Sequence, residues 1–328
     1  MLRWISKSGT FIQFIIFTLL LAALWVPSIV APHQPVITPQ DGPLFTLMAG
    51  GLMNSPLLSV ALAIILIILQ AFLLNNVYRS NGFFGRDNML PAIILMLAYS
   101  WSSDYQTLHA LLPATLFVII ALHSIMHMYG QHAAYQQLFV ASFATGLAAL
   151  FYIPLAYLLL MLWFTLITYR VSSWREYAVS IIGYGLPFVY YVSWLFWTDN
   201  LPAGLIKLSE SVYHLVIPAR IPLIDTIWLS VSAFMLLVAM TAVLNNMNDK
   251  LISLRRRSWV LFNFSLTALI ATLLTGWPIL SANYIFVIPL SFFITGSFIL
   301  IKRSFWFEML ALAYFLLFVA MRIFPFYF

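Results

Sequence analysis

Long apolar runs, separated by short polar segments that contain proline or glycine, occupy nearly the whole 328-residue chain. A helix needs about 20 consecutive apolar residues to cross about 30 Å of hydrocarbon. The spacing of the runs predicts about eleven membrane spans joined by short connections. The predicted spans are 10–31, 57–77, 90–101, 108–127, 137–151, 154–169, 177–198, 224–244, 259–275, 284–301 and 304–324.

The fifth and sixth predicted spans lie in one uninterrupted apolar stretch. We divide this stretch at Tyr152-Ile153-Pro154, because proline removes a helical hydrogen bond and favours a break. The first span follows Arg3 and Lys7 and looks superficially like a signal peptide. Ile29 stands where a small residue would precede a cut after Ala31, so we expect a retained span.

Composition agrees with this pattern: 63% of residues are hydrophobic and only 7% are charged, against roughly a quarter in soluble proteins. Too few polar groups are present to cover a soluble globule of this size. A soluble domain, a disordered chain and a coiled coil are therefore excluded. The sequence predicts an all-α fold, a polytopic transmembrane helical bundle formed by a single integral membrane domain over residues 1–328.

The positive charges predict the orientation of the bundle. With the N-terminus in the cytoplasm, twelve Lys and Arg residues fall inside and three fall outside, as the positive-inside rule requires. The inner residues are Arg3, Lys7, Arg79, Arg86, Arg170, Arg175, Lys250, Arg255, Arg256, Arg257, Lys302 and Arg303. The C-terminus is then outside. The net charge of +6 is explained by this rule, so we expect membrane lipid and not nucleic acid as a partner.

Two outer segments are expected to lie in the membrane interface, near residues 32–56 and 201–218. The first contains Thr-Pro-Gln-Asp-Gly-Pro around Asp41, and its apolar piece Leu44–Met53 is too short to span. The second has the periodicity of an amphipathic helix. Its apolar face comprises Leu205, Leu208, Val212 and Leu215, and its polar face comprises Lys207, Glu210 and His214.

Acidic residues are unexpectedly frequent on the outer side. Asp41, Asp104, Asp199, Glu210 and Asp225 fall there, although acids respond weakly to the topology rule. Asp41 and Asp104 follow the first and third spans, so we expect them to meet over one outer cavity as catalytic carboxylates. The alternatives are local: Asp41 as an Asx-turn residue that caps a short helix, and Asp104 as the N-cap of the fourth span.

Three basic residues, Lys207, Arg220 and Arg322, lie outside against the topological bias. Arg220 stands between Pro218 and Pro222 in an apolar setting that is unusual for a solvated charge. Cationic side chains bind phosphate, and guanidinium does so through two parallel hydrogen bonds. All three are candidate ligands of a lipid phosphate. The alternatives are exposure to water for Lys207 and snorkelling to the interface for Arg322.

Several kinds of chemistry have no support in the sequence. The chain has no cysteine, and it lacks nucleotide-binding loops, serine-hydrolase elbows and zinc-protease motifs. His123 and His127 are four residues apart but have no accompanying Glu, so we predict no metal site there. Any reaction would need a substrate that is already activated.

The layout of an acid in an outer interfacial loop after the first span, and another acid after the third, resembles the C-type (GT-C) membrane glycosyltransferases. Ser142–Leu150, followed by Pro154, is similar to the small-residue segment of these enzymes. The chain also resembles an uncharacterised bacterial inner-membrane family through Leu150–Pro154 and Trp174-Arg175-Glu176. This resemblance implies a multi-pass protein of the bacterial inner membrane.

The resemblance also implies an activity: transfer of a sugar from a polyprenyl-phosphate carrier to an acceptor on the extracytoplasmic face. Asp41 would orient or deprotonate the acceptor hydroxyl, and Asp104 would position the acceptor. A divalent metal at these acids is compatible with the resemblance. Arg220 would stabilise the negative charge that develops on the leaving lipid phosphate.

Two other functions stay open. A lipid or lipid-linked-glycan transporter would need alternating cavities, and Pro113, Pro154, Pro187 and Pro289 are placed to break spans. A non-catalytic membrane subunit of an envelope assembly would instead tolerate changes at the candidate residues and would bind partner membrane proteins.

Overall fold

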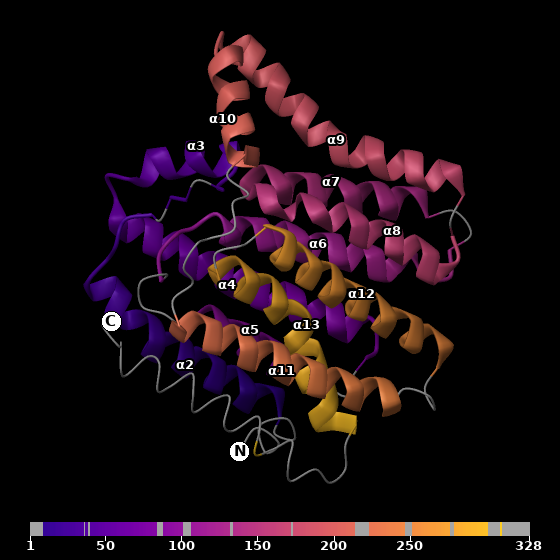
Figure 1. Cartoon of the computed structure of the whole chain (residues 1–328). Helices are drawn as coiled ribbons and strands as arrows, with labels where there is room; N and C mark the ends of the chain where they lie inside the picture. The colour runs from indigo at the N-terminus through magenta and orange to yellow at the C-terminus, as the bar shows by residue number, and fades with distance from the viewer. Residues whose placement is uncertain are drawn as a thin grey trace.

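The computed structural model describes residues 9–35, 37–38, 40–83, 88–100, 106–131, 134–171, 173–213, 223–246, 251–275, 279–300 and 309. Within these ranges the chain is helical and has no β-strand, which confirms the predicted all-α class. Twelve α-helices and one 3-10 helix, η1, make up the described part of the fold (Figure 1).

The helices are α2 (Thr10–Val30), α3 (Pro43–Leu52), α4 (Pro56–Ser80), α5 (Leu90–Tyr99), α6 (Leu111–Met128), α7 (Tyr135–Phe151), η1 (Ile153–Tyr157), α8 (Leu158–Tyr169), α9 (Trp174–Trp197), α10 (Leu201–Tyr213), α11 (Leu223–Asn246), α12 (Ile252–Thr275) and α13 (Ile279–Leu300). Helices therefore occupy ten of the eleven predicted spans. The eleventh, 304–324, lies outside the described residues apart from Met309.

Four of the described helices, α2, α4, α6 and α9, are long and apolar enough to cross a membrane. Their outer surfaces carry large exposed apolar side chains such as Phe11, Ile65 and Trp197. A soluble protein would bury such side chains, whereas lipid solvates them without cost. The protein is a helical membrane protein.

The predicted break at Pro154 is confirmed. Helix α7 ends at Phe151, Tyr152 has extended backbone angles (φ −143°, ψ 105°), and η1 begins at Ile153 with Pro154 in its first turn. Helix α8 then continues from Leu158. The long apolar stretch is thus two separate helices joined by a short irregular segment.

Helices α7 and α9 pack with their backbones in close contact. A Cβ atom added at Gly146 would overlap the carbonyl oxygen of Tyr184, and one added at Gly183 would overlap Ser142 Oγ. Small residues permit such an approach between helices when apolar burial alone supplies little attraction in lipid. The small-residue segment of α7 therefore acts as the surface on which α9 packs.

Buried polar side chains join helices elsewhere in the bundle. The Gln70 side-chain amide on α4 donates to the Leu112 carbonyl on α6 at 2.8 Å, and the Thr115 hydroxyl donates to Gln70 Oε1 at 2.9 Å. The Tyr78 hydroxyl on α4 donates to the Ile288 carbonyl on α13 at 2.7 Å. These hydrogen bonds give the buried Gln70 amide and Tyr78 hydroxyl partners in an apolar interior.

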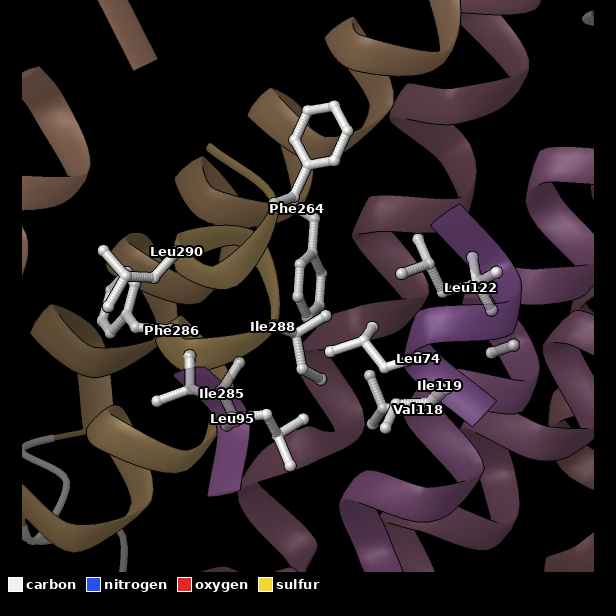
Figure 2. Packing of buried hydrophobic residues seen from close by; sticks show 14 of the residues in the cluster. Leu74, Leu95, Val118, Ile119, Leu122, Phe264, Ile285, Phe286, Ile288 and Leu290 are labelled. Carbon is white, nitrogen blue, oxygen red and sulfur yellow. The ribbon is translucent and has the colours of Figure 1, made fainter. Parts of the chain in front are cut away.

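The apolar core lies where α13 packs against α5 and α6, with α4 packed on α5 and α6 and α12 packed on α13. Figure 2 shows side chains of this core: Leu74, Leu95 and Ile119 come from the earlier helices, and Phe264 and Ile288 come from the later ones. All five side chains are fully or almost fully buried. Chain segments about 150 residues or more apart therefore form one core, which holds the two parts of the bundle together.

The contact of α7 with α9 is tested by Gly146→Ala. Its methyl group would press against the Tyr184 backbone, so we expect a lower thermal unfolding temperature in detergent, with a loss of about 1–3 kcal/mol. Gly185→Ala on α9 is the matched control, because nothing lies within 4 Å of its added Cβ. Equal unfolding temperatures for the two variants would contradict the close packing.

Candidate active site

The loop that carries Asp41 is bound to the break between α7 and η1. Asp41 and Tyr152 form an isolated antiparallel bridge, and the Gly42 N–H donates to the Phe151 carbonyl at 2.8 Å. The break would otherwise leave these polar backbone groups without helical partners. The Asp41 loop thus supplies the hydrogen bonds that the interrupted helix has lost.

Gln40 strengthens the same pairing from both its backbone and its side chain. Its carbonyl accepts a hydrogen bond from the Ile153 N–H at 3.3 Å, and its Oε1 accepts one from the Tyr152 hydroxyl at 2.8 Å. Gln40 and Tyr152 are both buried. The position of Asp41 is therefore determined by residues more than 100 positions later in the chain.

Gly42 is required for this docking. A Cβ atom at this position would overlap the Leu150 carbonyl oxygen and would lie 2.8 Å from the Phe151 carbonyl carbon. Both obstacles are backbone atoms, which cannot move aside as a flexible side chain can. Only glycine lets the loop approach the end of α7 so closely.

The Asp41 carboxyl group is held in one orientation by Thr38. The Thr38 N–H donates to Oδ2 and the Thr38 hydroxyl donates to Oδ1, both at 2.7 Å. Asp41 makes no side-chain capping bond to α3, whose N-cap is Gly42, so the alternative that Asp41 caps this helix is wrong.

Burial changes the acidity of this group. Asp41 is only 4% exposed, and desolvation raises its pKa from 3.8 to about 6, against the opposing effect of the two Thr38 hydrogen bonds. Such a carboxylate is ionised at neutral pH yet binds a proton far more readily than an ordinary aspartate. This is the acidity that a general base needs near pH 7.

Asp41 borders a cavity of about 240 Å³ between its own loop, α3 and α10. In Figure 1, α3 and α10 meet near the end of α7. The cavity is lined by Thr38, Asp41, Pro43, Thr46, Lys207, Glu210 and Ser211. The described lining residues thus bring one ammonium group, two carboxyl groups and three hydroxyl groups to a space large enough for a small polar substrate group.

Helix α10 contacts both this site and the neighbouring helix α9. The Ser211 hydroxyl donates to the Asp41 carbonyl at 3.2 Å, and Gly204 lies against Leu195 of α9 with no room for a Cβ. Leu208 packs on a small apolar cluster with Leu150 and Leu195. The predicted amphipathic segment is therefore a helix over Leu201–Tyr213, and residues 214–218 lie outside the described part.

The structure describes two of the five predicted site residues, Asp41 and Lys207. Asp41 and Lys207 line the same cavity. Asp104, Arg220 and Arg322 lie outside the described residues, so their meeting with Asp41 stays a prediction. Sequence reasoning missed Glu210 as a site residue. Its spacing of three residues from Lys207 was the available signal, because it puts both side chains on one face of α10.

Metal-binding potential is limited in the described residues, where no group of three or more His, Cys, Asp or Glu side chains could hold an ion. His123 and His127 are adjacent, with ring centroids 4.4 Å apart, and His127 Nδ1 lies 2.8 Å from the His123 carbonyl oxygen. Among the described residues that line the cavity, Asp41 and Glu210 carry carboxylates.

Comparison with protein-family models, with curated proteins and with solved structures finds no match to this chain.

Gly42→Ala tests whether the docked loop positions Asp41. The added methyl group would force the loop away from the end of α7, so we expect faster proteolysis of the α2–α3 connection and lower thermal stability. Gly51→Ala in α3 is the control, because its Cβ meets nothing within 4 Å. Wild-type proteolysis of Gly42→Ala would show that the loop does not depend on this contact.

The raised pKa of Asp41 predicts a pH dependence of stability. The folded chain binds the Asp41 proton more tightly than the unfolded chain, so the stability contributed by this group falls as pH rises from about 4 to about 6. Asp41→Asn should remove this decline in the unfolding temperature, whereas Asp199→Asn should retain it. Parallel profiles for wild type and Asp41→Asn would contradict the assignment.

Proposed function

We propose that the chain is a multi-pass protein of the bacterial inner membrane with about eleven spans, a cytoplasmic N-terminus and an external C-terminus. The twelve-to-three distribution of positive charges supports this orientation. The Asp41 cavity follows the first span, α2, so in this orientation it opens on the extracytoplasmic side. Its substrates would then reach it from the outer leaflet or from the space beyond.

We further propose that the protein is a membrane glycosyltransferase that takes a sugar from a polyprenyl-phosphate carrier. The observation that carries this proposal is the Asp41 carboxylate, buried, with a pKa of about 6, and bordering a cavity that also contains the Lys207 side chain. A base of this acidity suits a hydroxyl acceptor, and a neighbouring cation suits a phosphate leaving group.

The proposed reaction is a displacement at the anomeric carbon of the carrier-bound sugar. The acceptor hydroxyl oxygen forms the new bond to this carbon, and the bond from the carbon to the phosphate oxygen breaks. The acceptor proton moves to the Asp41 carboxylate, and polyprenyl phosphate leaves with the electron pair. No nucleotide is needed, because the phosphate bond of the carrier provides the activation.

The surrounding groups support these two roles. Thr38 holds both carboxylate oxygens of Asp41, which limits rotation of the base. Lys207 supplies a positive charge from the facing helix to offset the charge that develops on the leaving phosphate. The Asp41 carboxylate is thus oriented before substrate binds, and a preorganised group needs no rearrangement during the reaction.

The surface beside the cavity suits the lipid part of such a donor. Leu47 on α3 and Ile206 on α10 are 51% and 57% exposed, so both helices that line the cavity also carry exposed apolar side chains. We propose that the polyprenyl chain contacts apolar side chains of these two helices while its phosphate lies at the cavity. Buried apolar area would then contribute to donor binding in addition to charge.

Asp41→Asn tests the proposed function directly. We expect it to lower transfer of labelled sugar from polyprenyl phosphate by at least about 100-fold, because the neutral amide cannot accept the acceptor proton. Transfer would be measured with purified protein in vesicles, using a panel of polyprenyl-phosphate sugars. Asp199→Asn is the matched control and should keep wild-type activity, since Asp199 does not line the cavity.

Two results would contradict the proposal. Undiminished transfer by Asp41→Asn would remove Asp41 from the mechanism. Movement of a labelled lipid-linked sugar across the vesicle membrane without formation of a glycosidic bond would identify a transporter instead.

A further inference from the structure

A second cluster of functional groups lies at the opposite end of the helices from the Asp41 cavity. Tyr129 follows α6 near the start of α7, whereas Asp41 pairs with the residue after its end. The Tyr129 ring contacts the Tyr169 ring at the end of α8, with centroids 5.4 Å apart. Arg256 and Arg257, in the first turns of α12, place their guanidinium carbons 5.9 and 5.7 Å from the Tyr129 centroid.

This arrangement fixes the two arginines against an aromatic surface. Helices α8 and α12 pack together, and Figure 1 shows α12 beside α8. Arg257 is further oriented because its Nη1 donates to the Asn81 carbonyl at the end of α4, at 3.4 Å. Cation–π contacts and this hydrogen bond limit the freedom that long arginine side chains normally have.

Two hydrogen-bond donors in this cluster have no acceptor among the residues that the structure describes. The Tyr169 hydroxyl and Arg257 Nε are both buried and make no hydrogen bond with any residue in the described part of the chain. Tyr169 is only 5% exposed. A buried donor without a partner is costly, and native proteins satisfy most such donors with another protein group, an ordered water or a bound ligand. Both donors belong to side chains that lie against the Tyr129 ring.

The local charge indicates what that bound group is. Arg255, Arg256 and Arg257 are consecutive cations, and no ion pair with a described carboxylate neutralises them. Two donors and a net positive charge call for an anion with several oxygen acceptors. Phosphate has this chemistry, and arginine binds it through more than one hydrogen bond.

We propose that Tyr169, Arg256 and Arg257 form a binding site for a phosphate group, supplied by the headgroup of an anionic phospholipid. The Tyr169 hydroxyl and Arg257 Nε donate to phosphate oxygens, and Arg256 adds a second positive charge. Leu251, Ile252 and Trp259 are exposed apolar side chains around the start of α12, and they provide a surface for the acyl chains. The site does not depend on the reaction proposed at Asp41.

The position of the site fits this ligand. The charge pattern predicts that this end of the bundle faces the cytoplasm, where the inner leaflet carries anionic lipids. General attraction between a basic surface and these lipids needs no particular side chain. The buried Tyr169 hydroxyl adds a contact from a single uncharged group. Dependence of binding on this group distinguishes a specific site from general electrostatic attraction.

Tyr169→Phe is the decisive variant, because it removes the hydroxyl and keeps the ring and the charge. The purified full chain in neutral detergent would be titrated with phosphatidylglycerol, with phosphatidylcholine and with inorganic phosphate, and thermal unfolding would report binding. We expect phosphatidylglycerol, but not phosphatidylcholine, to stabilise the wild type. Tyr169→Phe should bind phosphatidylglycerol about tenfold more weakly. Without lipid, its unfolding temperature should equal or exceed that of the wild type, because an unsatisfied hydroxyl is gone.

Arg257→Gln and Arg255→Gln form a matched pair, since each removes one charge from the same run. Arg257→Gln should weaken binding as strongly as Tyr169→Phe, and Arg255→Gln should weaken it much less. Stabilisation by inorganic phosphate that is lost in Tyr169→Phe would support the same site with a soluble phosphate as ligand. Equal lipid responses of wild type and Tyr169→Phe, or equal losses in the two arginine variants, would overturn the proposal.

Discussion

The candidate active site depends on the hydrogen bonds that the Asp41 loop makes with the broken end of α7. A helix interrupted in an apolar environment leaves polar backbone groups that water cannot satisfy, and the cost of leaving them unpaired is several kcal/mol. The loop meets this need through Gly42 and Gln40, and in doing so it places Asp41 at a definite point. The break at Pro154 and the catalytic candidate are therefore parts of one structural arrangement.

Exclusion of water also explains the properties of the buried polar groups at the two ends of the bundle. At the Asp41 end, burial of the carboxyl group raises its pKa to about 6, which turns an ordinary aspartate into a candidate base. At the other end, the buried Tyr169 hydroxyl has no acceptor within the described part of the chain, and its ring contacts Tyr129, against which Arg256 and Arg257 lie. In each case removal of water raises the free energy of the charged or unpaired state of the polar group. The group therefore binds a proton or a ligand more readily than it would in water. The apolar bundle between them, joined by close α7–α9 packing and by bonds such as Tyr78 to Ile288, keeps both ends in place.

Much of the local structure was predictable from short-range patterns. The apolar runs predicted the positions of the described helices, Pro154 predicted the break, and the spacing of residues along 201–218 predicted an amphipathic helix. These features depend on backbone chemistry and on side-chain periodicity over a few turns. The interpretation of Asp41 as a helix cap failed because its partner, Thr38, lies before it in the chain and not in the helix that follows.

The sequence alone determined that this chain is a helical membrane protein, because a chain with 7% charged residues cannot cover itself in water. It also singled out Asp41 as an outer acid in a loop rich in proline and glycine. Only the tertiary structure decided that Lys207 and Glu210 share a cavity with Asp41, and that Tyr169 and Arg257 meet at Tyr129. These groups are far apart in sequence, and their meeting follows from how helices pack, which no local pattern along the chain encodes.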